Sequence, residues 1–128
     1  MIKDIKGKVV LITGASTGIG ASAAVAFGRN AAKVVVHYNK SFDSAKQVAQ
    51  KVVDAGGDAI TIQGDVVDSA VCRSLIHDTV SHYGRIDVLI NNAGGLIKRE
   101  KVEDITDELF SQVVDLNSRS ALIATSAA

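Results

Sequence analysis

The sequence has little that would direct it to a membrane, to nucleic acid or to a disulfide framework. Its longest apolar runs, such as Val-Val-Leu-Ile, are far too short to cross a bilayer. Its 14 basic and 14 acidic residues give a formal net charge of zero, so no face is obviously built for nucleic acid or an anionic membrane. Cys72 is the only cysteine, which excludes disulfides within the chain and a cysteine-based metal site.

Other targeting and metal-binding signals are also missing. The charged N-terminal residues are not followed by the apolar segment that a secretory signal needs. His37, His77 and His82 form no ligand spacing with carboxylates, so we expect no metal site. Cys72 is expected in the core rather than as a nucleophile. The length of 128 residues suits one domain, and 47 % apolar residues are enough for a core. We expect a cytoplasmic protein without a nucleic-acid or membrane partner.

Apolar runs rich in β-branched residues alternate with helical patterns along the chain. The runs lie at residues 8–13, 33–38, 59–63 and 86–90. They are continuous rather than alternating, which is typical of strands buried on both faces of a parallel sheet. The helical patterns cover residues 18–30, 41–55 and 68–83, and a fourth helix is expected to begin near Thr106. The order predicts an α/β fold, a Rossmann-type doubly wound parallel sheet with four strands in the order 3-2-1-4 and flanking helices.

Local signals set details of these helices. Ser41 and Asp68 are predicted N-caps, and Gly56-Gly57 and Gly84 are predicted helix ends. The first helix is predicted to bury one stripe formed by Ile19, Ala23, Ala26 and Phe27. The last segment indicates a helix with no fifth strand after it, so we expect residues 1–128 to be the first part of a larger domain.

The glycine-rich stretch Thr-Gly-Ala-Ser-Thr-Gly-Ile-Gly follows the first strand and opens the first helix. At a helix N-terminus, free amides and the helix dipole favour a phosphate. Gly14 is predicted to make the tight turn, Gly18 to let a pyrophosphate approach, and Gly20 to pack the helix on the strand. Ser16 and Thr17 add hydroxyl donors. We therefore predict a dinucleotide at this loop.

The alternative is a plain strand-to-helix turn with close packing, because the spacing Gly-x-x-x-Gly-x-Gly differs from the commoner Gly-x-Gly-x-x-Gly. The strand before the loop and the helix after it favour the dinucleotide. A P-loop is disfavoured, because Ala21-Ser22 stands where Lys-Ser/Thr would be required.

Four motifs together resemble the short-chain dehydrogenase/reductase family, especially its bacterial members. They are Thr13–Gly20 as quoted above, then Gly64-Asp65-Val66, Asn91-Asn92-Ala93-Gly94 and Asn117. They stand in the family's order at about its intervals and cover essentially the whole chain. The resemblance implies an NAD(P)-dependent oxidoreductase that transfers a hydride between the nicotinamide and a small-molecule alcohol or carbonyl substrate. It also implies a homo-oligomer, because the last helix commonly lies at a subunit interface in the family.

The resemblance assigns the residues after the third and fourth strands to the cofactor. It places Asp65 on the adenine amino group, beside Val66, and it makes Asn92, Ala93 and Gly94 line the cofactor cleft. The predicted cofactor contacts are Gly14, Ser16, Thr17, Gly18, Ile19, Gly20, Tyr38, Asn39, Lys40, Ser41, Asp65, Val66, Asn92, Ala93 and Gly94. Taken alone, Asp65 can also be a solvated loop residue or a helix cap, and the Asn-rich tetrad can be a simple turn.

Asn117 has two interpretations. It shares a helical stripe with Phe110, Val113, Val114, Ala121 and Ala124, which predicts a buried amide that must be hydrogen-bonded. From the pattern alone it can be a core asparagine satisfied by backbone. The resemblance makes it a member of the catalytic tetrad that holds a water in the proton relay.

The Ser, Tyr and Lys that complete this tetrad in the family are absent. Neither Tyr38 nor Tyr83 has a lysine four residues later, so the family's Tyr-x-x-x-Lys does not occur. We therefore expect residues 1–128 to form the cofactor-binding part without catalysing the reaction alone. One alternative is a non-catalytic nucleotide-binding or structural fragment. The other is a methyltransferase-like domain, which the motif Asn91-Asn92-Ala93-Gly94 makes less favourable.

The end of the second strand bears on the choice of nicotinamide cofactor. A site selective for NAD usually places an acid there to hold the ribose hydroxyls. This chain has Lys40 and Ser41 instead, and the nearest acid, Asp43, lies in the next helix. The sequence therefore favours NADP(H) over NAD(H). The alternative is that Lys40 is an ordinary solvated loop lysine.

Overall fold

A computed structural model describes residues 2–128 and shows one parallel four-stranded sheet. Its strands are β1 (Val9–Ile12), β2 (Lys33–Tyr38), β3 (Asp58–Gln63) and β4 (Val88–Ile90). Their order is β3-β2-β1-β4, with Leu11 of β1 paired to Val35 and to Leu89. The predicted fold class and strand order are confirmed.

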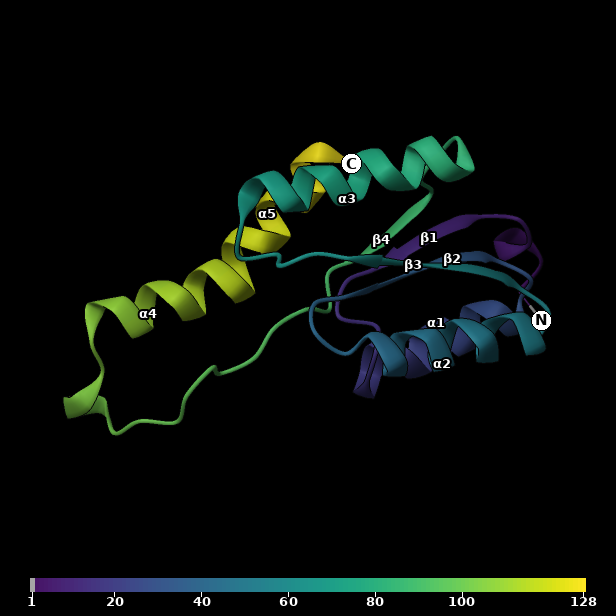
Figure 1. The fold of residues 1–128 in the computed structure, drawn as a ribbon. Helices are drawn as coiled ribbons and strands as arrows, with labels where there is room; N and C mark the ends of the chain where they lie inside the picture. The colour runs from purple at the N-terminus through teal and green to yellow at the C-terminus, as the bar shows by residue number, and fades with distance from the viewer. Residues whose placement is uncertain (1) are drawn as a thin grey trace.

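Helices cover both faces of the sheet (Figure 1). On one face lie α1 (Gly18–Arg29) and α2 (Phe42–Asp54), and on the other lie α3 (Ser69–Tyr83) and α5 (Ser120–Ala127). Each face has its own apolar core, because alternate residues of a strand point to opposite sides. Thus Val34 and Val36 belong to the α1/α2 core, whereas Val35 belongs to the α3 core.

Burial on both faces holds for the two central strands only. All four residues of β1 are buried, as are the middle four of β2. The inner residues of β3 and all of β4 are half-buried, so the prediction is wrong for these two strands. They form the edges of the sheet, where each strand has a neighbour on one side only.

The buried stripe of α1 differs from the predicted one. Ile19 is 83 % exposed and Ala26 is exposed, whereas Gly20, Ala24 and Gly28 are buried. A Cβ atom at Gly28 would lie 2.9 Å from the carbonyl oxygen of Val52 in α2. The two helices therefore meet backbone to backbone through the smallest residues. A pattern of apolar side chains does not predict such a contact.

Most of the predicted helix ends are confirmed. Asp68 accepts a hydrogen bond from the Ala70 amide, and Thr106 caps α4 (Asp107–Val114) by accepting one from the Leu109 amide. Gly84 ends α3 in the left-handed conformation with φ 82°. Ser41 precedes α2, but its side chain makes no capping bond. Its ψ of 65° departs from the extended conformation that a capping side chain normally requires.

Of the predicted stripe through Asn117, Ala124 at its end is buried, but the rest is not. The first part of this last helical segment, α4, has no buried residue and extends away from the sheet (Figure 1), and Phe110 is 62 % exposed. A π-helical segment, η3 (Asp115–Arg119), then connects α4 to α5, and Asn117 within it is exposed. The wider π turn breaks the spacing of three and four residues on which the prediction depended.

Candidate functional site

A cavity of about 710 Å³ lies where the carboxyl ends of the strands meet the glycine loop. Nearly all the residues predicted to contact a cofactor line it: Gly14, Ser16, Thr17, Gly18, Ile19, Tyr38, Asn39, Lys40, Ser41, Asp65, Val66, Asn92, Ala93 and Gly94. Gly20 does not line it, and two residues that the sequence analysis did not assign to a site, His37 and Leu116, do.

The three glycines of the loop differ in what surrounds them. A Cβ atom at Gly14 would lie 2.9 Å from the Cα atom of Ala93, and one at Gly20 would lie 2.5 Å from the side-chain nitrogen of Asn92. Both glycines are therefore required by packing within the protein. Gly18 has a φ of 59°, and a Cβ atom there would meet nothing within 4 Å. The backbone at Gly18 is thus exposed to the cavity.

The N-terminus of α1 is open toward the same cavity. Thr17 occupies the N-cap position, but its side chain makes no capping hydrogen bond. The first turn of α1 contains no acidic residue that would oppose an anion. Its amides and the positive end of the helix dipole are therefore available to a phosphate group.

Thr13 and Asn92 fix the end of β4 against the glycine loop. The Thr13 hydroxyl oxygen accepts hydrogen bonds from the amides of Asn92 and Ala93, both at 3.0 Å. The Asn92 side-chain amide donates to the carbonyl oxygens of Thr13 and Gly14, at 3.1 and 2.9 Å. Asn91 lies elsewhere and donates to the Thr125 hydroxyl. Only one of the two adjacent asparagines therefore joins the strand ends.

His37 is one of the two lining residues that were not predicted from the sequence. It is only 2 % exposed. The Gly14 amide donates to its Nδ1 at 2.9 Å, and its Nε2 lies 2.7 Å from the carbonyl oxygen of Gly64. Burial lowers the pKa of His37, against the raising effects of the Gly64 carbonyl and Asp65. A histidine at the end of an otherwise apolar, buried strand was the available signal.

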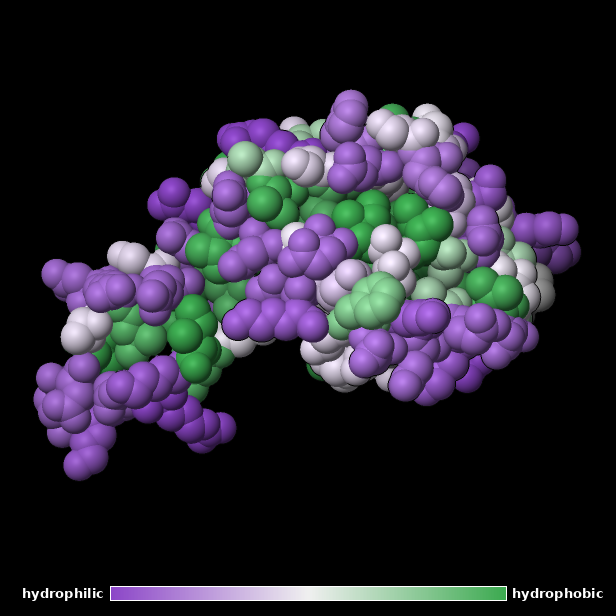
Figure 2. Space-filling view, viewed as in Figure 1, coloured by the Kyte–Doolittle hydropathy of each residue, from purple (hydrophilic) through white to green (hydrophobic). Residues whose placement is uncertain are grey.

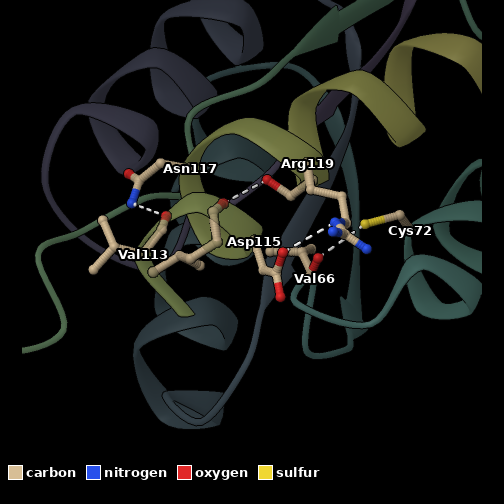
Figure 3. A network of polar contacts seen from close by, with 8 residues as sticks. Val66, Cys72, Val113, Asp115, Asn117 and Arg119 are labelled. Carbon is tan, nitrogen blue, oxygen red and sulfur yellow. Dashed lines mark hydrogen bonds and ion pairs between the residues drawn. The ribbon is translucent and has the colours of Figure 1, made fainter. Parts of the chain in front are cut away.

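The turn after β3 presents Asp65 and Val66 to the cavity. Asp65 is exposed and accepts a hydrogen bond from the Val67 amide at 3.1 Å, whereas Asp68 is the helix cap. The carbonyl oxygen of Val66 accepts a hydrogen bond from the Cys72 thiol at 3.1 Å (Figure 3). Cys72 is buried, as predicted, and burial raises the pKa of its thiol, which keeps it protonated.

Asn117 lies beside the cavity rather than on its lining. Its amide donates to the carbonyl oxygens of Gly95 and Val113 at 2.7 and 2.9 Å, and its oxygen accepts from the Gly95 amide at 2.9 Å. Figure 3 shows the bond to Val113 next to the Asp115–Arg119 ion pair. The side chain is therefore satisfied by backbone groups, although it is exposed and not in the core.

The rim of the cavity beyond β2 carries one cation. Lys40 and Ser41 are exposed there, and Asp43 lies in the first turn of α2. The neighbouring Asn39 is held through its carbonyl oxygen, which accepts from the Gln63 side chain at 3.0 Å. A bound group at this position would therefore meet a basic and a hydroxyl side chain.

Within residues 2–128, no group of three or more His, Cys, Asp or Glu side chains is arranged to hold a metal ion. No helix in the same range is long and apolar enough to span a bilayer.

A cavity at the carboxyl ends of parallel strands, bounded by a glycine loop and a helix N-terminus, defines a Rossmann-type nucleotide-binding domain. The chain belongs to the short-chain dehydrogenase family, whose sequence profile matches residues 8–128. The predicted resemblance is confirmed, and the methyltransferase-like alternative is excluded.

Similar proteins include curated oxidoreductases. An uncharacterized oxidoreductase of Methylorubrum extorquens is 40 % identical over 99 % of this chain and 51 % of the relative. Versicolorin reductase 1 of Aspergillus parasiticus is 43 % identical over 90 % of this chain and 44 % of the relative. The chain thus spans about half the length of the curated relatives it matches.

Solved structures of the same fold contain either nicotinamide cofactor. The NADH-dependent reductase A1-R′ in complex with NAD superimposes with a TM-score of 0.95 at 39 % identity, over 100 % of this chain and 53 % of that one. A putative dehydrogenase from Burkholderia cenocepacia with bound NADP gives a TM-score of 0.89 at 29 % identity, over 95 % and 47 %.

Proposed function

We propose that the protein is an NAD(P)(H)-dependent oxidoreductase and that residues 1–128 supply its cofactor-binding half. The reaction is hydride transfer between the nicotinamide and a small-molecule alcohol or carbonyl substrate. The observation that carries the proposal is the open backbone at Gly18, above an uncapped helix N-terminus. A dinucleotide pyrophosphate requires this kind of cradle.

The remaining lining residues suit the other parts of a dinucleotide. The Asp65 carboxylate can accept from the adenine amino group, and Val66 provides an apolar neighbour. The small residues Ala93 and Gly94 leave space for a ribose. Their position is fixed by the neighbouring Asn92, whose side-chain amide donates to the carbonyl oxygen of Thr13, just after β1. When bound, the nicotinamide supplies the hydride, and these residues hold and orient it.

We further propose that residues 1–128 do not catalyse this reaction alone. In the family a tyrosine protonates the substrate carbonyl, and here Tyr83 donates a hydrogen bond to Asp58, which begins β3 at the other end of the sheet. Burial further raises the pKa of Tyr83 above its usual range. Asn117 keeps its proposed role in the proton relay, next to Leu116, which lines the cavity.

We propose a preference for NADP(H) over NAD(H). A 2′-phosphate at the rim beyond β2 would meet Lys40 and Ser41, whereas Asp65, the acid among the lining residues, follows β3. A charge-assisted contact of this kind contributes about 1.5 kcal/mol, which corresponds to roughly tenfold in affinity.

Replacing Lys40 by alanine is expected to reduce the ratio of NADPH to NADH affinity about tenfold, measured by fluorescence titration of both cofactors. Lys46→Ala is the matched control, because Lys46 is exposed on α2 and does not line the cavity. An unchanged ratio in Lys40→Ala would disprove the charge argument. Absence of binding by either cofactor to the wild type would disprove the proposed function itself.

We also propose that the protein forms a homo-oligomer through the apolar groove beside α4. This groove of about 370 Å³ includes the exposed side chains of Leu96, Ile105 and Phe110. Figure 2 shows hydrophobic residues gathered there between α4 and the segment before it. An exposed apolar surface of this kind is characteristic of an interaction site.

Phe110→Ser is expected to lower the molar mass measured by light scattering toward that of a monomer, because it removes the largest apolar side chain of the groove. Val102→Ser is the control, since Val102 is 85 % exposed and lies outside the groove. Equal masses for both variants and the wild type would exclude this groove as the interface.

A further inference from the structure

His37 holds two successive amides of the glycine loop. The Gly14 amide donates to its Nδ1 at 2.9 Å, and the Ala15 amide donates to its backbone carbonyl oxygen, also at 2.9 Å. These two amides lie within the turn that follows β1. The position of the loop relative to β2 therefore depends on one residue.

The other ring nitrogen reaches the end of β3. The Gly64 amide donates to the Tyr38 carbonyl oxygen at 3.0 Å, and the Gly64 carbonyl oxygen lies 2.7 Å from His37 Nε2. The imidazole thus joins the glycine loop to the turn that carries Asp65. Because the Gly14 amide needs an unprotonated Nδ1, only the neutral tautomer with its proton on Nε2 makes both bonds.

The geometry of Gly14 leaves little room for adjustment. Its φ is 64°, its carbonyl oxygen accepts from Asn92 at 2.9 Å, and Ala93 packs against its Cα. If its amide lost the bond to His37, a donor in the interior of the site would be left without an acceptor, which is unfavourable.

We propose that neutral His37 is a positioning residue of the cofactor site, and that protonation of its Nδ1 releases Gly14 and lowers the affinity for the cofactor. This inference rests on the proposed nicotinamide-binding function. His37 acts through the glycine loop and transfers no proton in the reaction. The site would therefore bind its cofactor less tightly at acidic pH, because the Gly14 amide loses its hydrogen bond to His37.

The burial of His37 and the charges around it determine the pH at which its ring becomes protonated. Residues 13–18 contain no ionisable side chain, and β3 carries only Asp58, at its far end. Asp65 acts on the imidazole from the turn after β3, Cys72 lies behind that turn, and Lys40 lies at the rim. Burial outweighs Asp65 and lowers the pKa of His37. The affinity should therefore be complete above pH of about 6.5 and decrease as the pH falls below it.

Two substitutions test the hydrogen bonds of His37 to Gly14 and to Gly64 one at a time. His37→Asn places an amide oxygen near the position of Nδ1, so it retains an acceptor for Gly14 but cannot titrate. His37→Gln reaches the position of Nε2, so it retains the donor to Gly64 and leaves the Gly14 amide without an acceptor. NAD⁺ is the probe, because it lacks a 2′-phosphate that would itself titrate near pH 6.

Calorimetric titration of the wild-type protein with NAD⁺ is expected to show binding that weakens as the pH falls below about 6.5, by about fivefold once His37 is protonated. His37→Asn should bind throughout this pH range as the wild type does at pH 8. His37→Gln should bind about fivefold more weakly throughout. A pH dependence that persists in His37→Asn would overturn the inference, as would wild-type affinity that rises in acid, because the imidazolium would then act as a charge for the phosphates.

A second measurement needs no cofactor. In ¹H–¹⁵N spectra the Gly14 amide should shift with the protonation of the His37 ring, and this shift should be absent in His37→Asn. If Gly14 does not follow the ring, the positioning role is wrong even if NAD⁺ binds. If Gly14 follows the ring but NAD⁺ does not bind at any pH, the proposed function fails, and the claim about affinity fails with it.

Discussion

Gly18→Ala is expected to lower the affinity for NAD(P)H at least tenfold. The new methyl group would occupy open space at the cavity lining, where no atom beyond the adjacent stretch of chain lies within 4 Å. A pyrophosphate needs this space to reach the amides at the start of α1. Alanine at a φ of 59° also costs about 1 kcal/mol of stability, because the left-handed region is unfavourable for residues with a Cβ atom.

Gly84→Ala is the matched control for this prediction. Gly84 also has a positive φ, 82°, and open space around its missing side chain, but it ends α3 and does not line the cavity. Urea unfolding should show similar losses of stability for both variants, whereas fluorescence titration should show weaker binding for Gly18→Ala only. Equal affinities in the two variants would reject the assignment of the loop to the pyrophosphate.

Thr13→Val is expected to reduce the free energy of unfolding by roughly 1–3 kcal/mol, since the half-buried Ala93 amide loses its acceptor and the Asn92 amide retains the Ile90 carbonyl oxygen. Thr13 is 4 % exposed, and its hydroxyl oxygen accepts from both Asn92 and Ala93. Valine has nearly the same shape, so the loss reports on the hydroxyl group rather than on packing. Binding of the cofactor should also weaken, because Asn92 and Ala93 line the cavity.

Thr13→Ser is the control that separates the hydroxyl group of Thr13 from its methyl group. It retains the hydroxyl group and removes only a methyl group, so its loss should be about 1 kcal/mol in urea unfolding. If serine destabilises the protein as much as valine does, packing of the methyl group determines the effect and the role assigned to the hydroxyl group is wrong.

The residues of the candidate site could largely be predicted from the sequence. Gly14 and Gly18 after the first strand, Lys40 after the second, Asp65 after the third and Asn92 after the fourth all line one cavity. The reason is topological: continuous apolar strands alternating with helices require a parallel sheet, and the carboxyl ends of parallel strands meet at one edge. Residues at these ends become neighbours whatever the details of packing.

Contacts that depend on distances between remote segments could not be predicted in this way. His37 and Gly14 are 23 residues apart, and Thr13 and Ala93 are 80 apart. No local pattern shows that a histidine ring will meet a particular amide, because ring orientation is decided by the packing of three strand ends. The roles of Thr13 and His37 in shaping the site therefore appear only in the folded chain.

The helices show the same division between sequence and structure. Capping residues determined where α3 and α4 begin, since this signal acts within one turn of helix. Which face of α1 is buried was decided by α2, which approaches so closely at Gly28 that glycine contacts backbone. The exposure of Asn117 was decided by the π-helical turn in η3, because one wider turn rotates every later side chain relative to the earlier ones.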